Sequence, residues 1–127
     1  MRRDLKSGTT LVIDRYAHSG VAFTAAKKVA SVDWCKGPDR GLPCPDVIFY
    51  FHLSSEEALK RSGYGEERYE KKSFQEEVAR VYEKLRDGSW FDVDASNSID
   101  EIHKQLWDKT SSLLSTINNK EIGKLWT

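Results

Sequence analysis

The chain of 127 residues lacks most features of secreted, membrane-bound or nucleic-acid-binding proteins. It has two cysteines, Cys35 and Cys44, without CxxC spacing or a histidine set nearby, so we expect reduced thiols rather than a disulfide or a metal clip. No apolar run approaches the roughly 20 residues of a membrane span, and no signal-peptide core follows the first residues. Acidic and basic residues number 20 each, which argues against a nucleic-acid partner. We expect one globular domain over residues 1–127, in the cytosol or also in the nucleus.

The sequence does contain a regular alternation of short apolar runs and amphipathic segments. Strands are expected over residues 9–13, 47–53 and 90–94, and the nearly continuous apolar run of 47–53 is typical of a central strand. Strands that alternate with helices predict an α/β fold with a parallel sheet flanked by helices.

The helices are predicted from spacing and from capping residues. Residues 2–6 form a helix end before Gly8, and residues 16–29 form a second helix. Ser54 and Ser98 each open a capping box. The helix after Ser54 is short, and the last helix has an apolar face of Ile99, Ile102, Leu106, Leu113 and Ile117.

A long amphipathic helix is expected to start between residues 67 and 73, because apolar residues then recur at helical spacing at Phe74, Val78, Val81 and Leu85. Glycine and proline break residues 37–45 into turns, and residues 125–126 are expected to pack the tail back onto the body.

Asp14 and Arg15 stand where the first apolar run stops. The carboxyl end of a strand in an open α/β sheet is where such folds bind ligands. A guanidinium can fork onto phosphate oxygens, and a carboxylate can hold hydrated Mg²⁺ directly or through water. The alternative is an interior ion pair, and the two residues alone do not separate the interpretations.

The sequence that follows favours the phosphate interpretation. The segment DRYAHSGVAFTAAK at residues 14–27 closely resembles the segment after the third strand of thymidylate kinases. Further matches in the same order are DWC (33–35), GLP (41–43), PD (45–46), GEERYE (65–70), FQ (74–75) and VDAS (93–96). The resemblance covers essentially the whole chain, and it corresponds to the later part of such an enzyme.

This resemblance implies transfer of a phosphoryl group from ATP to dTMP, giving dTDP for dTTP biosynthesis, with Mg²⁺ as cofactor and a homodimeric enzyme. Asp14 would organise Mg²⁺ through water, and Arg15 would hold the acceptor phosphate. Arg61 and Arg68 bracket a glycine-bearing segment, expected to act as a lid that brings guanidinium groups onto the phosphates. The resemblance further implies a dTMP pocket with Ser19, Gly20, Phe23, Tyr69 and Gln75, and an ATP site with Arg61, Asp94, Ala95 and Ser96.

The family's glycine-rich phosphate loop, which ends in Gly-Lys-Ser/Thr, has no counterpart in the 127 residues. We therefore expect an incomplete P-loop nucleoside monophosphate kinase fold, with the first strand and P-loop absent. The unpaired strand edges predict a marginally folded or aggregation-prone chain of very low activity. The alternatives are a catalytically dead partner that binds a nucleotide or a full-length subunit, and a nonfunctional product.

Overall fold

The computed structural model describes residues 1–54, 56–57, 60, 67–117 and 119–127, and for residues 67–71 only the backbone is described. The elements in chain order are α1 (Arg2–Lys6), α2 (Ala17–Ala26), α3 (Val32–Lys36), the 3₁₀ helix η1 (Gly37–Asp39), β1 (Ile48–His52), α5 (Glu67–Leu85), β2 (Trp90–Asp94) and α6 (Ile99–Leu114). They fall into two compact units. The helical unit comprises Met1–Pro45, Glu70–Arg86 and Ile122–Thr127, and the sheet unit comprises Asp46–Tyr69 and Asp87–Glu121.

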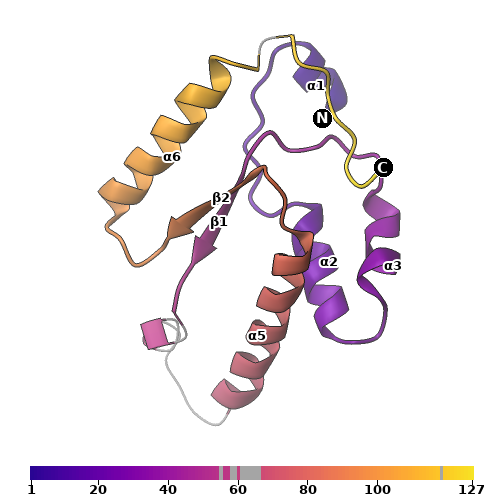
Figure 1. Ribbon diagram of the computed structural model, residues 1–127, viewed down its shortest axis with the longest axis vertical. Helices are drawn as coiled ribbons and strands as arrows, with labels where there is room; N and C mark the ends of the chain where they lie inside the picture. Colours follow the sequence, from indigo (N-terminus) through magenta and orange to yellow (C-terminus); the bar gives the residue numbers. More distant parts are fainter. Residues whose placement is uncertain (55, 58–59, 61–66, 118) are drawn as a thin grey trace. The chain divides into compact units, whose positions relative to one another are not determined.

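The helical unit has its core between α2 and α5, which lie alongside each other (Figure 1). Small and β-branched side chains of α2 are buried, and α5 contributes the stripe that its apolar spacing predicts. α5 begins at Glu67, within the expected interval. The buried residues of this unit are Ala17, His18, Val21, Ala22, Ala26, Cys35, Pro43, Val78, Val81, Leu85 and Leu125.

The C-terminal tail packs back onto the helical unit, as the sequence predicts. The Gly41 N–H donates to the Leu125 carbonyl at 2.9 Å, and the Leu125 N–H donates to the Leu42 carbonyl at 2.8 Å. The Cys44 N–H donates to the Gly123 carbonyl at 3.0 Å. These bonds bring Leu125 into the core, where it is 3% exposed.

The sheet unit is built on β1 and β2, which pair in parallel with Ile48 opposite Trp90 and His52 opposite Asp94 (Figure 1). The predicted strands 47–53 and 90–94 are therefore confirmed to within one residue at each end. Val93 is fully buried, whereas the β1 residue Phe51 is 48% exposed. The expected central position of 47–53 is not realised, because the described sheet has only these two strands.

Helix α6 follows β2 through a short turn and starts at the predicted capping box. The Ser98 hydroxyl accepts from the Glu101 N–H at 3.2 Å, and the Glu101 carboxylate accepts from the Ser98 N–H at 3.3 Å. Ile99 is 85% exposed, so this first residue of the expected apolar face is not part of a core. The other predicted cap is also present, since Ser54 Oγ accepts from the Glu57 N–H at 3.1 Å.

The prediction of a strand over residues 9–13 is wrong. These residues form neither a helix nor a strand, and Val12 is 95% exposed. An apolar run becomes a strand only when a neighbouring strand accepts its backbone hydrogen bonds, and none of the described residues supplies one here. Residues 32–36, for which the sequence predicts no helix, form α3, and Ser31 caps this helix because its Oγ accepts from the Trp34 N–H at 3.1 Å.

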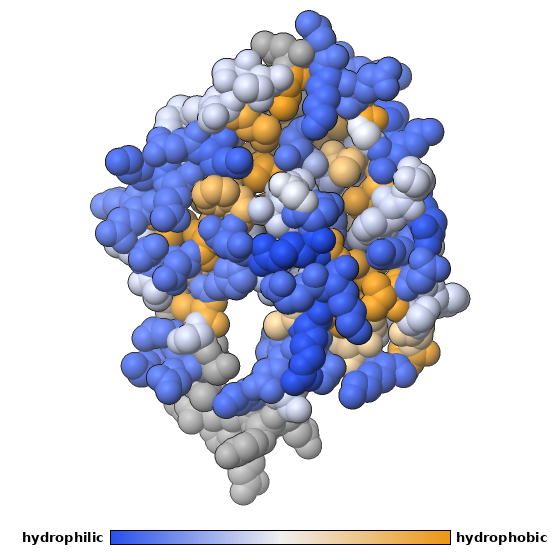
Figure 2. Space-filling model, viewed as in Figure 1, coloured by the Kyte–Doolittle hydropathy of each residue, from blue (hydrophilic) through white to orange (hydrophobic). Residues whose placement is uncertain are grey.

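Hydrophobic side chains come to the surface at several separate places among hydrophilic ones (Figure 2). The large apolar residues that are exposed are Met1, Val12, Ile13, Val29, Trp34, Phe51, Ile99, Trp107 and Leu114. Among the described residues, no helix is both long enough and apolar enough to cross a membrane.

Candidate active site

Arg15 has an unusual backbone conformation immediately before α2. Its φ is +64°, in the left-handed region that residues with a Cβ seldom adopt. Asp14 and Arg15 are both exposed and lie in a bend. This excludes the interior ion pair and leaves both charged groups accessible to a ligand.

The Arg15 side chain folds back over the first turns of α2. Its Nε donates to Ser19 Oγ at 3.3 Å, and its guanidinium carbon lies 4.9 Å from the centre of the Phe23 ring. Residues 15, 19 and 23 are spaced by four. They therefore lie on the same side of α2, with residue 15 just before the helix and residues 19 and 23 within it. Contact with an aromatic face stabilises a guanidinium by about 0.5–1 kcal/mol at an exposed site. The sequence-predicted residues Arg15, Ser19 and Phe23 are thus brought together.

Helix α5 completes this cluster from the other side. The Phe74 ring lies 5.9 Å from the Phe23 ring, and the Tyr82 hydroxyl lies 2.9 Å from Ser19 Oγ. We call Arg15, Ser19, Phe23, Phe74 and Tyr82 the α2–α5 cluster. It presents a guanidinium, hydroxyl groups and aromatic faces together, which suits a flat, weakly polar base that carries a phosphate.

The N-terminus of α2 adds positive potential beside Arg15. Tyr16 occupies the N-cap position but gives the helix no side-chain cap, and the first turn contains no acidic residue. The first N–H groups of a helix, together with its dipole, favour anions. The Tyr16 hydroxyl instead donates to the Pro43 carbonyl at 2.8 Å, and burial raises the pKa of this phenol.

The other residues predicted for the dTMP pocket contribute less to the described geometry. Gly20 is exposed on α2 next to Ser19, and a Cβ added to it would meet no atom within 4 Å. Gln75 is exposed on α5 next to Phe74. Arg61 and the side chains of Arg68 and Tyr69 lie outside the described residues, as does most of the predicted lid.

The loop after β2, predicted to border ATP, belongs to the sheet unit. Asp94 Oδ1 accepts from the Ser96 hydroxyl at 2.6 Å and from the Ser96 N–H at 2.9 Å. These bonds hold the pKa of the Asp94 carboxyl below its usual value. The Ala95 N–H donates to the His52 carbonyl at 2.8 Å, which ties the loop to the end of β1. The loop is a tightly hydrogen-bonded turn rather than an open chain.

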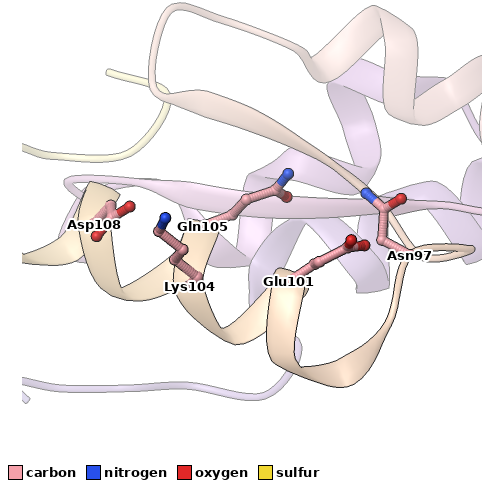
Figure 3. A pocket seen from close by; sticks show the side chains of 5 residues that line it. All are labelled: Asn97, Glu101, Lys104, Gln105 and Asp108. Carbon is pink, nitrogen blue, oxygen red and sulfur yellow. The ribbon is translucent and has the colours of Figure 1, made fainter.

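A shallow polar depression adjoins this loop on α6 (Figure 3). It is lined by Asn97, Glu101, Lys104, Gln105 and Asp108, which come from the turn and from the first three turns of the helix. Because Asn97 directly follows residues 94–96, the depression extends the predicted ATP-binding loop onto α6.

The fold family implies Mg²⁺, and the described carboxylates are the residues that could hold it. No group of three or more His, Cys, Asp or Glu residues in the described part of the chain could hold a metal ion. Mg²⁺ commonly binds through one or two carboxylates, several waters and substrate phosphates. The exposed Asp14 beside Arg15 fits that mode, in which most ligands come from water and from a nucleotide.

Tyr82 and the ring contact of Phe74 are the parts of the cluster that sequence reasoning missed. The sequence predicts Phe74 as a residue of an apolar helix face and of a segment matched to the family, but not as a ring contact of Phe23. Tyr82 is four residues after Val78, so it continues the same helical stripe with a hydroxyl at its edge. The position of Tyr82 on this stripe is the signal in the sequence that could have identified it.

Comparisons with known proteins identify the family of the chain. The thymidylate kinase family model matches residues 1–106. The human thymidylate kinase is 43% identical over 129 residues, which cover 99% of this chain and 61% of the human protein. The Dictyostelium discoideum thymidylate kinase is 47% identical over 122 residues, covering 95% of this chain and 54% of the relative.

A solved structure extends the match to the fold. The thymidylate kinase of Candida albicans superposes with a TM-score of 0.60 at 34% identity, covering 79% of this chain and 54% of the other. The chain thus spans about 54–61% of the length of these relatives. By family model, sequence and fold, this chain belongs to the thymidylate kinase family of nucleoside monophosphate kinases, and it has part of their P-loop α/β fold.

Proposed function

We propose that this chain provides the dTMP-binding part of an enzyme that transfers the γ-phosphoryl group of ATP to dTMP, giving ADP and dTDP. The α2–α5 cluster carries the proposal, since it combines an exposed guanidinium with two aromatic rings 5.9 Å apart. Family membership supplies the substrates, because the relatives are thymidylate kinases.

In this proposal, Arg15 holds the phosphate of dTMP. Its Nε is used by Ser19, so the N–H groups of Nη1 and Nη2 can fork onto two phosphate oxygens. The uncapped start of α2 adds N–H groups and a favourable dipole at the same place. Phe23 contributes an aromatic face for thymine, and Gln75, Gly20 and Tyr69 remain predicted pocket residues.

Asp14 would hold Mg²⁺ through water, and the ion would neutralise charge on the reacting phosphates. On the donor side, Asp94, Ala95 and Ser96 border ATP, and Arg61 and Arg68 approach its phosphates. The sequence contains no glycine-rich loop ending in Gly-Lys-Ser/Thr, so these residues alone give the ATP phosphates no such cradle. We expect very slow phosphoryl transfer by the 127 residues alone.

A second candidate function is binding without catalysis. The chain could bind a nucleotide, or a full-length kinase subunit, without catalysing transfer. The α2–α5 cluster binds the monophosphate both in the kinase and in a partner that binds a nucleotide, so dTMP binding alone does not separate these two functions.

We also propose a homodimer formed through the surface of the helix predicted over 16–29, in a cytosolic or nuclear enzyme. Beyond the end of α2, Val29 is 75% exposed and Trp34 is 69% exposed. With Ala30 and Ser31 they line an apolar hollow of about 350 Å³. Covering such side chains is a common reason for self-association.

Light scattering tests this contact by comparing the molar mass of Trp34→Glu with that of the parent chain.

Two measurements test the proposed function together. Calorimetric titration with dTMP should show binding, and coupled ADP release at high chain concentration should show slow turnover. Arg15→Ala should weaken dTMP binding about 10-fold or more and abolish turnover, whereas Arg80→Ala, which removes an exposed arginine paired with Glu77 on α5, should change neither. Binding without turnover supports the partner, and absence of dTMP binding contradicts both the kinase and a partner that binds a nucleotide.

A further inference from the structure

A chain of polar contacts runs behind Arg15, away from its exposed end. Arg15 Nε donates to Ser19 Oγ at 3.3 Å, and Ser19 Oγ lies 2.9 Å from the Tyr82 hydroxyl. Tyr82 is 63 positions further along the chain and comes from α5, whereas the other two residues lie at the start of α2. The hydroxyl of Ser19 is thus held from both sides.

The Arg15 side chain needs such a hold because it is exposed. A free arginine has many rotamers, and fixing them on binding a ligand opposes affinity. Here the Phe23 ring lies against one face of the guanidinium, and Ser19 fixes the Nε side. In the described part of the chain, Nη1 and Nη2 of Arg15 have no hydrogen-bond partner. These two nitrogens are therefore available to a ligand, while the Nε and one face of the guanidinium are restrained.

Ser19 can perform this role only if its own hydroxyl is oriented. A serine hydroxyl has one proton and rotates to suit its partners. Either Ser19 or Tyr82 can donate in their contact, and in both cases the bond restricts the hydroxyl rotation and keeps a lone pair directed to Arg15. Ser19 and Tyr82 are both half-buried, so water replaces this bond poorly.

We propose that Tyr82 is a positioning residue for the phosphate-binding guanidinium, and that it acts on Arg15 through the Ser19 hydroxyl. The inference rests on the proposed function insofar as dTMP is the ligand, but the restraint of Arg15 is a property of the unliganded chain. Tyr82 itself does not touch the ligand. Its effect is therefore specific to ligands that carry a phosphate.

The test is Tyr82→Phe, which keeps the aromatic ring and removes only the hydroxyl. The first readout is the exchange of the Arg15 Nε–H proton with water in ¹⁵N NMR of the unliganded chain. We expect exchange to accelerate about five-fold when the restraint is lost. Tyr50→Phe, a hydroxyl deletion on β1 in the sheet unit, is the control and should leave Arg15 unchanged.

The second readout is calorimetric affinity for dTMP and for thymidine. Tyr82→Phe should weaken dTMP binding about five-fold and leave thymidine binding unchanged. Ser19→Ala should reproduce the effect, and Ser19→Ala with Tyr82→Phe should be no weaker than Ser19→Ala alone, since both act on one contact.

The inference is overturned if the exchange rate of the Arg15 Nε–H is unchanged in Tyr82→Phe. It is also overturned if Tyr82→Phe loses equal affinity for dTMP and thymidine, or if the effects of Ser19→Ala and Tyr82→Phe on dTMP affinity are additive. If the parent chain binds no dTMP, the proposed function fails, and the exchange measurement still decides whether Tyr82 restrains Arg15.

Discussion

At the scale of single residues, Arg15 combines two features that seldom occur together. Its backbone is in the left-handed region, and its charged side chain is held by Ser19 and Phe23 at the start of a helix. Left-handed conformations at residues with a Cβ cost energy and concentrate at ligand sites. At this left-handed bend, the Arg15 side chain lies over the first turns of α2.

This conformation predicts a difference between two substitutions that remove the same guanidinium. Arg15→Gly should be about 0.5–1 kcal/mol more stable than Arg15→Ala. Alanine at a φ of +64° has a steric cost from its Cβ, and this cost exceeds the entropy that the more flexible glycine loses on folding. Both should lose phosphate binding. Denaturant unfolding monitored by tryptophan fluorescence measures the difference, and a more stable alanine variant would show that the bend is not strained.

Tyr16 predicts a loss of stability in alkali. Burial raises the pKa of its phenol above the ordinary value of about 10. The folded state thus disfavours the phenolate, so stability is complete below pH 10 and decreases as pH rises from there through the folded pKa. Absorbance titration near 295 nm should show one late phenol, which disappears in Tyr16→Phe. That variant should also lose about 1 kcal/mol with the hydrogen bond to Pro43.

At the scale of elements, the predictions succeed where the signal is local. The Ser98 capping box, the apolar stripe of α5 and the runs that form β1 and β2 were all predictable, since each depends on neighbouring residues. The segment 9–13 has an equally clear apolar run but forms no strand, because a strand needs a partner from elsewhere. Arg15 was predictable from its place after an apolar run, and Ser19 and Phe23 were predictable from the family resemblance, whereas Tyr82 reaches Ser19 across 63 positions that no local pattern connects.

The capping box predicts a specific loss in α6. Ser98→Ala should destabilise this helix by about 1 kcal/mol, since it removes the acceptor for the Glu101 N–H. Ser112→Ala, on an exposed site inside the same helix, is the matched control and should be neutral or slightly stabilising. Hydrogen exchange of α6 amides reports both, and equal protection in the two variants would contradict the role of the cap.

The tail predicts a larger effect in the helical unit. Leu125→Ala should destabilise the chain by about 2–3 kcal/mol, because it leaves a cavity where a side chain 3% exposed now lies. Leu114→Ala removes the same atoms from a site that is 40% exposed and should cost less than about 1 kcal/mol. Urea unfolding compares the two, and similar losses would mean that the tail does not contribute to the core.

At the scale of the whole molecule, burial is distributed unequally. The helical unit has buried residues from α2, α3, α5 and the tail, whereas Val93 is the one fully buried hydrophobic residue among the described residues of the sheet unit. A two-stranded sheet is marginal in water unless further strands or packed helices support it. Exposed edges and apolar side chains such as Phe51 also favour association.

We therefore expect the 127 residues alone to unfold without a sharp transition at low concentration and to self-associate as concentration rises. Differential scanning calorimetry and light scattering over a concentration series measure this. A single cooperative transition of a monomer in dilute solution would contradict it.

The central claim is that Arg15 holds the phosphate of a thymine nucleotide within the α2–α5 cluster. The most direct measurement is a calorimetric cycle that compares dTMP with thymidine in the parent chain and in Arg15→Ala. The account predicts that the parent prefers dTMP by about 10-fold or more, and that Arg15→Ala removes most of this preference while retaining thymidine affinity. An equal preference for dTMP in both proteins would contradict the account.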